Sequence, residues 1–134
     1  MIKISDAREV SQEEIVALYE ANKWSSAKKP DELYKALLNS DYLVTARDAG
    51  KLVGIGNALS NGYLVVYYPH LLVLPEYHGK GVGKMIMKKF AQKYGHLHQQ
   101  ILVADGGAIQ FYEKCGFEKA GETQSMWIYK GGDH

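Results

Sequence analysis

An apolar stretch that leads into a glycine-rich turn most constrains how this chain can fold. Residues 63–74 are apolar almost throughout, which is typical of a strand buried on both faces of a sheet. Because Pro69 within it cannot donate to a ladder of hydrogen bonds, we expect a bulge there. The turn contains three glycines, Gly79, Gly81 and Gly83. Apolar residues then repeat at helical spacing, so the sequence predicts a strand, a tight turn and a helix in succession.

Two helices and two hairpin turns are expected before this stretch. Ser11 and Glu14 have the spacing of a capping box, which starts a first helix. Pro30 suits the first turn of a second helix. The hairpin turns, at residues 48–51 and 60–62, make the next three strands antiparallel neighbours.

Shorter elements are expected after the glycine-rich turn. Residues 100–104 form an apolar strand, and Asp105 is expected to cap a fourth helix. A closing pair of strands is predicted from Phe117 onward, with its second member at residues 125–129, followed by a frayed tail at residues 131–134.

The length and the charge limit the class of protein. A chain of 134 residues has the size of one domain, so we predict a single α/β (mixed α+β) domain over residues 1–134. The formal charge of +1 predicts no general attraction to nucleic acid or to a membrane. The lone cysteine, Cys115, cannot form an internal disulfide, and we find neither a signal peptide nor a membrane anchor. We therefore expect a cytoplasmic protein.

The glycine-rich turn at the start of a helix is typical of a phosphate site. Helix N-termini carry unpaired N–H groups, glycines allow close approach, and Lys80 and Lys84 add positive charge. A tight turn beside a solvated, lysine-rich helix face is the alternative. A Walker motif does not fit because Met85 stands where Ser or Thr is needed. Hairpins before the turn also argue against a Rossmann fold.

Two motifs stand in the second half of the chain. Residues 71–83 read LLVLPEYHGKGVG, and residues 108–117 read AIQFYEKCGF. In this order and spacing they resemble the signatures of the GNAT superfamily of N-acetyltransferases, Gln/Arg-x-x-Gly-x-Gly/Ala and Ala-x-x-Phe-Tyr-x-Lys-x-Gly-Phe. The chain departs at His78, where the family usually has Gln or Arg, and at Asp105, where Asn often stands.

The resemblance covers nearly the whole chain and carries expectations about fold and ligand. It implies a largely antiparallel central sheet, helices on both faces, and a parallel strand pair splayed at a cofactor cleft. It implies acetyl-CoA as cosubstrate and no metal, with pantetheine lying along one strand and pyrophosphate on the glycine-rich turn. A homodimer is common in the family. The expected cofactor-binding residues are Leu71, Leu72, Val73, His78, Gly79, Lys80, Gly81, Val82, Gly83, Lys84, Asp105 and Tyr112.

Two residues are the catalytic candidates. Tyr112 matches the tyrosine of the second motif and would protonate the departing thiolate, unless it is a core aromatic. His70 has a suitable pKa range for a general base, although a hydrogen-bonded core histidine or a chain of waters is an alternative. A free strand N–H near Val73 would stabilise negative charge on the acetyl oxygen.

The expected activity is acetyl transfer from acetyl-CoA directly to a primary amine of a small molecule, peptide or protein. A non-catalytic acyl-CoA-binding or sensing module is an alternative, and a nucleic-acid binder that uses the lysines of residues 80–93 is a third. Several residues could line an amine pocket or belong to the core, and these are Trp24, Ser25, Ser26, Tyr63, Tyr67, Tyr68 and Trp127.

Overall fold

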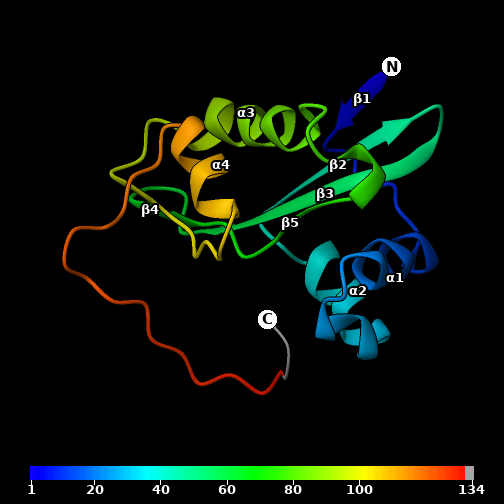
Figure 1. Cartoon of the computed structure of the whole chain (residues 1–134), viewed down its shortest axis with the longest axis horizontal. Helices are drawn as coiled ribbons and strands as arrows, with labels where there is room; N and C mark the ends of the chain where they lie inside the picture. The colour runs from blue at the N-terminus through cyan, green and yellow to red at the C-terminus, as the bar shows by residue number, and fades with distance from the viewer. Residues whose placement is uncertain (132–134) are drawn as a thin grey trace.

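The computed structural model describes residues 1–131, and Figure 1 shows the arrangement of its elements. In chain order these are β1 (Ile2–Ser5), α1 (Gln12–Ala21), η1 (Ser25–Lys28), α2 (Pro30–Leu38), β2 (Tyr42–Asp48), β3 (Lys51–Ser60), β4 (Val65–Tyr67), β5 (Leu71–Val73), η2 (Pro75–Tyr77), α3 (Val82–Tyr94), β6 (Gln99–Ile101) and α4 (Ala108–Lys114). The predicted tail beyond residue 131 lies outside the described residues. No helix between residues 1 and 131 is both long and apolar enough to cross a bilayer.

The helix starts follow from the local sequence. Ser11 accepts from the Glu14 N–H, and the Glu14 side chain accepts from the Ser11 N–H, so the predicted capping box is confirmed. Pro30 occupies the first turn of α2, where its missing N–H costs nothing.

The strands form one sheet in the order β1-β2-β3-β4-β6, with β5 also paired to β3. Every pairing is antiparallel except that of β4 with β6, which is parallel. The expected antiparallel sheet with one parallel strand pair is confirmed.

Helices cover both faces of this sheet (Figure 1). Gly54 and Gly56 of β3 face α3, and a Cβ on Gly56 would lie 3.0 Å from atoms of Ile86 and Phe90. The alternate residues of β3, such as the fully buried Ile55, face α1. Glycine on one face thus lets α3 approach the sheet closely.

The apolar stretch forms two short strands, β4 and β5, that both pair with β3. Leu59 pairs with Tyr67 and Gly56 with Leu71, so three residues, 68–70, lie opposite two residues of β3. That extra residue is the predicted bulge, and Pro69 lies in it. β6 pairs with β4 but not with β5, so the outer edge of β5 has no neighbouring strand within the described residues.

The predictions for the end of the chain were wrong in two respects. Gly107, rather than Asp105, is the N-cap of α4, because a turn at Gly106 with φ of 54° separates Asp105 from the helix. The exposed Asp105 contributes only its carbonyl, which accepts from the Ala108 N–H. The closing strands from Phe117 onward and at residues 125–129 are absent from the described chain, because the two arms of the turn at residues 121–122 form no ladder with each other or with β6.

Candidate functional site

The start of α3 presents several main-chain N–H groups to one place. Gly79 and Gly81 have φ of 78° and 83°, which favours glycine. The backbone hydrogen bond that opens α3 runs from the Met85 N–H to the Gly81 carbonyl at 3.0 Å, so the helix offers no acceptor to the N–H groups before it. Those groups belong to Val82, Gly83 and Lys84. A Cβ on Gly79 or Gly81 would meet no atom within 4 Å, so the turn has room for a phosphate group. We call this turn, residues 79–84, the cradle.

Two lysines add positive charge to the cradle. Lys80 Nζ lies 5.3 Å from the ring centre of Tyr77, whose hydroxyl donates to Asp48 at 2.7 Å. Lys84 is exposed in the first turn of α3. Because both lysines belong to the same turn as the unpaired N–H groups, the electrostatics favour an anion.

Helix α4 packs against the cradle through Gly83. A Cβ on Gly83 would lie only 3.0 Å from Cζ of Phe111, so the absence of a side chain lets the ring come close. The neighbouring Tyr112 packs its ring edge-on against Phe111 and Phe117. Burial, with a smaller effect of Cys115, raises the pKa of Tyr112 to about 12. The ring packs as a core aromatic would, while the hydroxyl keeps a proton to donate at neutral pH.

The outer edge of β5 offers main-chain groups. The Leu74 N–H donates to the Val53 carbonyl at 2.8 Å, and the Asn57 N–H donates to the His70 carbonyl at 3.1 Å. Residues alternate along a strand, so the main-chain groups of Leu71 and Val73 point away from β3. Leu71 and Val73 are half-buried, whereas Leu72 is buried on the α1 face.

The carbonyl and the N–H of Val73 have different surroundings. The carbonyl accepts from Asn22 Nδ2 at 3.1 Å and pairs with His78 Nε2 at 2.8 Å. Since a carbonyl can only accept, the hydrogen of His78 lies on Nε2. The Val73 N–H has no acceptor among the described residues, and it faces the open edge of β5.

His70 lies on the opposite face of the sheet, toward α1. Its Nδ1 is 2.7 Å from the hydroxyl of Tyr19, and its ring contacts Trp24 edge-on. Burial raises the pKa of Tyr19 well above its usual value, so the phenol keeps its proton. A buried hydroxyl that only accepted would leave this proton unbonded, so Tyr19 donates to Nδ1. The hydrogen of neutral His70 is then on Nε2, which favours a hydrogen-bond donor over a general base.

A hollow of about 470 Å³ lies beside His70. The predicted pocket residues Trp24, Ser25 and Ser26 line it. Within residues 1–131, the Ser26 hydroxyl is the buried side-chain oxygen or nitrogen without a hydrogen-bond partner. We call this cavity the His70 hollow. The other predicted pocket residues lie elsewhere, because Tyr68 stacks on Phe90 in the core and Tyr63, Tyr67 and Trp127 are exposed.

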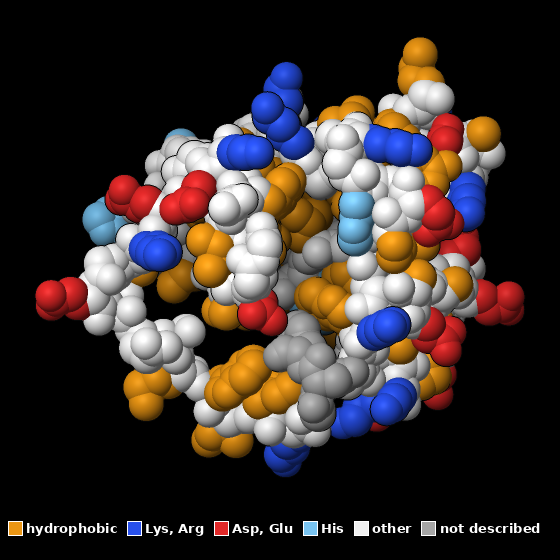
Figure 2. All heavy atoms as spheres, in the orientation of Figure 1, with side chains coloured by type: hydrophobic (Ala, Val, Ile, Leu, Met, Phe, Trp, Pro, Cys, Tyr) orange, Lys and Arg blue, Asp and Glu red, His pale blue; other side chains and the backbone are white. Residues whose placement is uncertain are grey.

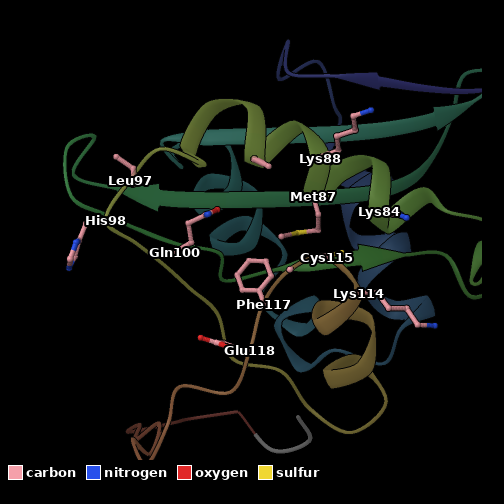
Figure 3. Close-up of a pocket in the computed structure, with 12 residues that line it drawn as sticks. Lys84, Met87, Lys88, Leu97, His98, Gln100, Lys114, Cys115, Phe117 and Glu118 are labelled. Carbon is pink, nitrogen blue, oxygen red and sulfur yellow. The ribbon is translucent and has the colours of Figure 1, made fainter.

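A second hollow, of about 520 Å³, lies between α3, β6 and the chain after α4. Lys84, Met87 and Lys88 of α3 line it. Figure 3 shows the Met87 side chain pointing toward Cys115 and Phe117, whereas the Lys88 side chain points away from them. It shares Lys84 with the cradle but contains neither Tyr112 nor His70. The structure thus brings α4 to the cradle and places His70 in a separate cavity.

Three residues of the site were missed in the sequence. Tyr19 belongs to α1, and Asn22 is the C-cap of that helix. Asn57 is buried in β3, where its Oδ1 accepts from the His70 N–H at 3.0 Å. Tyr19 continues the apolar spacing of α1 and so looked like a core residue. Asn57 could have been identified from the sequence, because it is a polar residue inside an apolar strand.

Known proteins are similar to this chain in sequence and in architecture. Residues 6–127 match the family model described as Acetyltransferase (GNAT) domain. An uncharacterized N-acetyltransferase, ycf52, of Pyropia yezoensis is 29% identical over 88% of this chain and 71% of its own length. The GNAT family acetyltransferase SP0256 of Streptococcus pneumoniae has a TM-score of 0.84 and 28% identity over 97% of this chain and 99% of its own.

A more distant structure has the same fold. The aminoglycoside N-acetyltransferase AAC(6')-Iy, solved in complex with CoA, has a TM-score of 0.66 and 19% identity over 97% of this chain and 94% of its own. The family model spans most of the sequence, and the sheet with its parallel β4–β6 pair agrees with it. This chain belongs to the GNAT acetyltransferase domain family.

Proposed function

We propose that this protein transfers the acetyl group of acetyl-CoA directly to a primary amine. The observation that carries the proposal is the cradle, whose free N–H groups lie shortly after the open edge of β5 along the chain. One feature binds a phosphate and the other binds an extended amide chain, and CoA contains both. The CoA complex of AAC(6')-Iy, a protein of the same fold, supports this assignment.

The main chain would hold the cosubstrate. The amides of residues 79–84 bind the pyrophosphate, and Leu71 and Val73 pair with the pantetheine arm as a neighbouring strand would. Acetyl-CoA supplies the activated acetyl group. The open Val73 N–H donates to the acetyl oxygen as its negative charge grows.

Tyr112 would act as the general acid. Its hydroxyl remains protonated because burial raises its pKa to about 12, and its helix contacts the cradle through Phe111 and Gly83. The proton passes to the thiolate that leaves when the acetyl group is transferred.

The His70 hollow would receive the amine. His70 donates from Nε2 and orients the acceptor, while water takes the proton that the attacking amine loses. Lys28 and Lys29 also line the hollow, and its lining within residues 1–131 contains no acidic residue. We therefore assign an amine that also carries a carboxylate or phosphate group as the acceptor class.

Two measurements test the function. Thermal unfolding with acetyl-CoA, CoA, NADH and ATP in parallel should show stabilisation by the two CoA species alone, because a ligand that binds the folded state raises its stability. Release of CoA thiol should then depend on an added amine, with anionic amines preferred over matched neutral-tailed ones. Stabilisation without thiol release from any amine would instead identify an acyl-CoA sensor. No stabilisation by either CoA species would reject both functions.

A further inference from the structure

A buried asparagine lies where β4 and β5 separate. Asn57 of β3 is 5% exposed and stands opposite the bulge. A regular antiparallel pair exchanges two main-chain hydrogen bonds. Here the Asn57 N–H donates to the His70 carbonyl at 3.1 Å, but the His70 N–H donates to Oδ1 of the Asn57 side chain at 3.0 Å. The side chain thus replaces one main-chain acceptor of the ladder.

The bulge changes the direction of the His70 N–H. The Tyr68 N–H donates to the Ile101 carbonyl of β6 at 3.1 Å. In a straight strand, residues two apart point their N–H groups to the same side, so the His70 N–H would also point toward β6. It points to β3 instead, because residues 68–70 include one extra residue and Asn57 accepts the bond. The parallel pairing with β6 therefore stops at Tyr68.

The extra residue also moves the His70 ring to the other face of the sheet. Side chains two apart share a face in a straight strand. The Tyr68 ring stacks on Phe90 of α3 with ring centres 4.8 Å apart, whereas the His70 ring contacts Tyr19 of α1. The bulge therefore places His70 in its hollow. The end of the chain does not force the strands apart, because Figure 2 shows an opening between residues 118–131 and the rest of the molecule, and none of those residues joins the sheet.

Buried hydrogen bonds hold the Asn57 amide group in this orientation. Its Nδ2 donates to the hydroxyl of the buried Ser40 at 3.0 Å, and that hydroxyl donates to the Ala36 carbonyl of α2 at 2.9 Å. With Nδ2 bound to Ser40, Oδ1 is the atom that faces His70. A chain of bonds thus runs from α2 to the bulge, and it satisfies polar groups that burial would otherwise leave without partners.

We propose that Asn57 is a positioning residue for acetyl transfer: it accepts the His70 N–H, and this bond ends the pairing with β6, turns His70 toward the hollow and keeps the edge of β5 open. This role rests on the proposed function, because the amine and acetyl-CoA would bind at those two places. Without this acceptor, the His70 N–H returns to the β6 side. In a parallel ladder that continues past Tyr68, the His70 N–H donates to the Val103 carbonyl and the Val103 N–H donates to the Tyr68 carbonyl.

Hydrogen exchange of the ligand-free protein tests the strand pairing. The Val103 N–H has no acceptor among residues 1–131, so it should exchange rapidly in the parent protein. Asn57→Leu keeps a branched side chain but cannot accept a hydrogen bond, and it should slow the exchange of Val103 about tenfold as the ladder with β6 extends. A general loss of stability would instead speed this exchange.

Ser40→Ala is the matched control. It removes the other partner of the Asn57 amide group but leaves Oδ1 bound to the His70 N–H. Its folding stability should fall about as much as that of Asn57→Leu, while Val103 should exchange as rapidly as in the parent protein.

Ligand binding and kinetics test the role in the reaction. Asn57→Leu should raise the Kd for CoA about tenfold and should also raise the KM for the amine, whereas Ser40→Ala should keep both constants. Asn57→Asp keeps an acceptor for the His70 N–H. It should therefore keep the CoA affinity of the parent protein in spite of the cost of burying a carboxylate.

Two results would each contradict this role for Asn57. One is exchange of Val103 that is no slower in Asn57→Leu than in the parent protein, and the other is an unchanged Kd and KM in that variant. If Asn57→Leu does not fold, Asn57→Thr gives the same comparison, because its hydroxyl is one bond shorter and threonine favours strands. A parent protein that neither binds CoA nor releases thiol would reject the proposed function, and the exchange of Val103, which needs no ligand, would still decide whether Asn57 ends the pairing with β6.

Discussion

The cradle and the His70 hollow are built from different parts of the chain. The cradle consists of consecutive residues, and its functional atoms are main-chain N–H groups held by glycine conformations. The hollow combines side chains from η1, the bulge before β5 and the end of the chain, and the Tyr19 hydroxyl of α1 orients its histidine. A consecutive motif can be read from the sequence, whereas a set of side chains from distant segments depends on how those segments pack.

The largest effect should come from Tyr112, the proposed general acid. Tyr112→Phe keeps the ring and its packing but removes the proton. We expect kcat to fall by on the order of 10²-fold or more, while the affinity for CoA is unchanged. Steady-state kinetics and calorimetric titration with CoA measure the two quantities. Full retained turnover would leave Tyr112 as a core aromatic only.

Gly81→Ala tests whether the cradle depends on main-chain geometry. Alanine at this position would have to adopt the left-handed φ of 83°, and its Cβ would enter the open space at the turn. We expect the Kd for CoA to rise about tenfold, together with a loss of about 1 kcal/mol of folding stability.

Gly62→Ala is the matched control, because Gly62 has φ of 79° and open space around it in the turn between β3 and β4. It should lose similar stability and keep its CoA affinity. Equal losses of affinity in both variants would show that strain alone, and not the cradle, controls binding.

Tyr19→Phe tests the hollow without touching the cradle. Losing the hydrogen bond to His70 should cost about 1 kcal/mol of stability. The hydrogen of His70 would then no longer be held on Nε2. The KM for the amine should rise because His70 no longer has a fixed orientation, and CoA affinity should stay constant. Tyr34→Phe on α2 is a suitable control. An unchanged KM for the amine in Tyr19→Phe would argue that His70 takes no part in acceptor binding.

The smallest effect concerns the ion pair that ties α1 to the sheet. Arg47 of β2 lowers the pKa of Glu14 from 4.5 to about 2, mainly through a side-chain hydrogen bond. A carboxylate with a lowered folded-state pKa stabilises the fold above its unfolded pKa, and this contribution is lost as the pH falls from about 4.5 to 2.

Glu14→Gln should therefore destabilise the protein by about 1 kcal/mol at pH 7. The difference from the parent protein should shrink toward zero near the lowered pKa of about 2. Denaturant unfolding at several pH values measures it. A difference that is the same at all pH values would assign the effect to the helix cap and not to the charge.

Much of the first two-thirds of the chain could be predicted because each element carries its own local signal. The capping box starts α1, Pro30 starts α2, and hairpin turns join β2, β3 and β4. The bulge at Pro69 was predicted from a missing donor, and the register between β3 and its two partners confirms it. Caps and turns depend on a few neighbouring residues, so they can be predicted without knowledge of the tertiary structure.

The end of the chain could not be predicted in the same way. Residues 125–129 have the composition of a strand, yet a strand forms only where another edge pairs with it. Asp105 has the residue type of an N-cap, but the turn at Gly106 places Gly107 there instead. In both cases the residue types favour the predicted structure, but the contact that this structure requires does not form.

The sequence by itself determined the family, the cradle and the order of the elements, because glycine spacing, caps and hairpin turns are properties of neighbouring residues. Only the tertiary structure decided that Tyr19 holds His70, that Phe111 packs on Gly83, and that no strand of residues 1–131 pairs with the outer edge of β6. These features depend on contacts between residues far apart in the chain, and their geometry follows from how the helices and the sheet pack together.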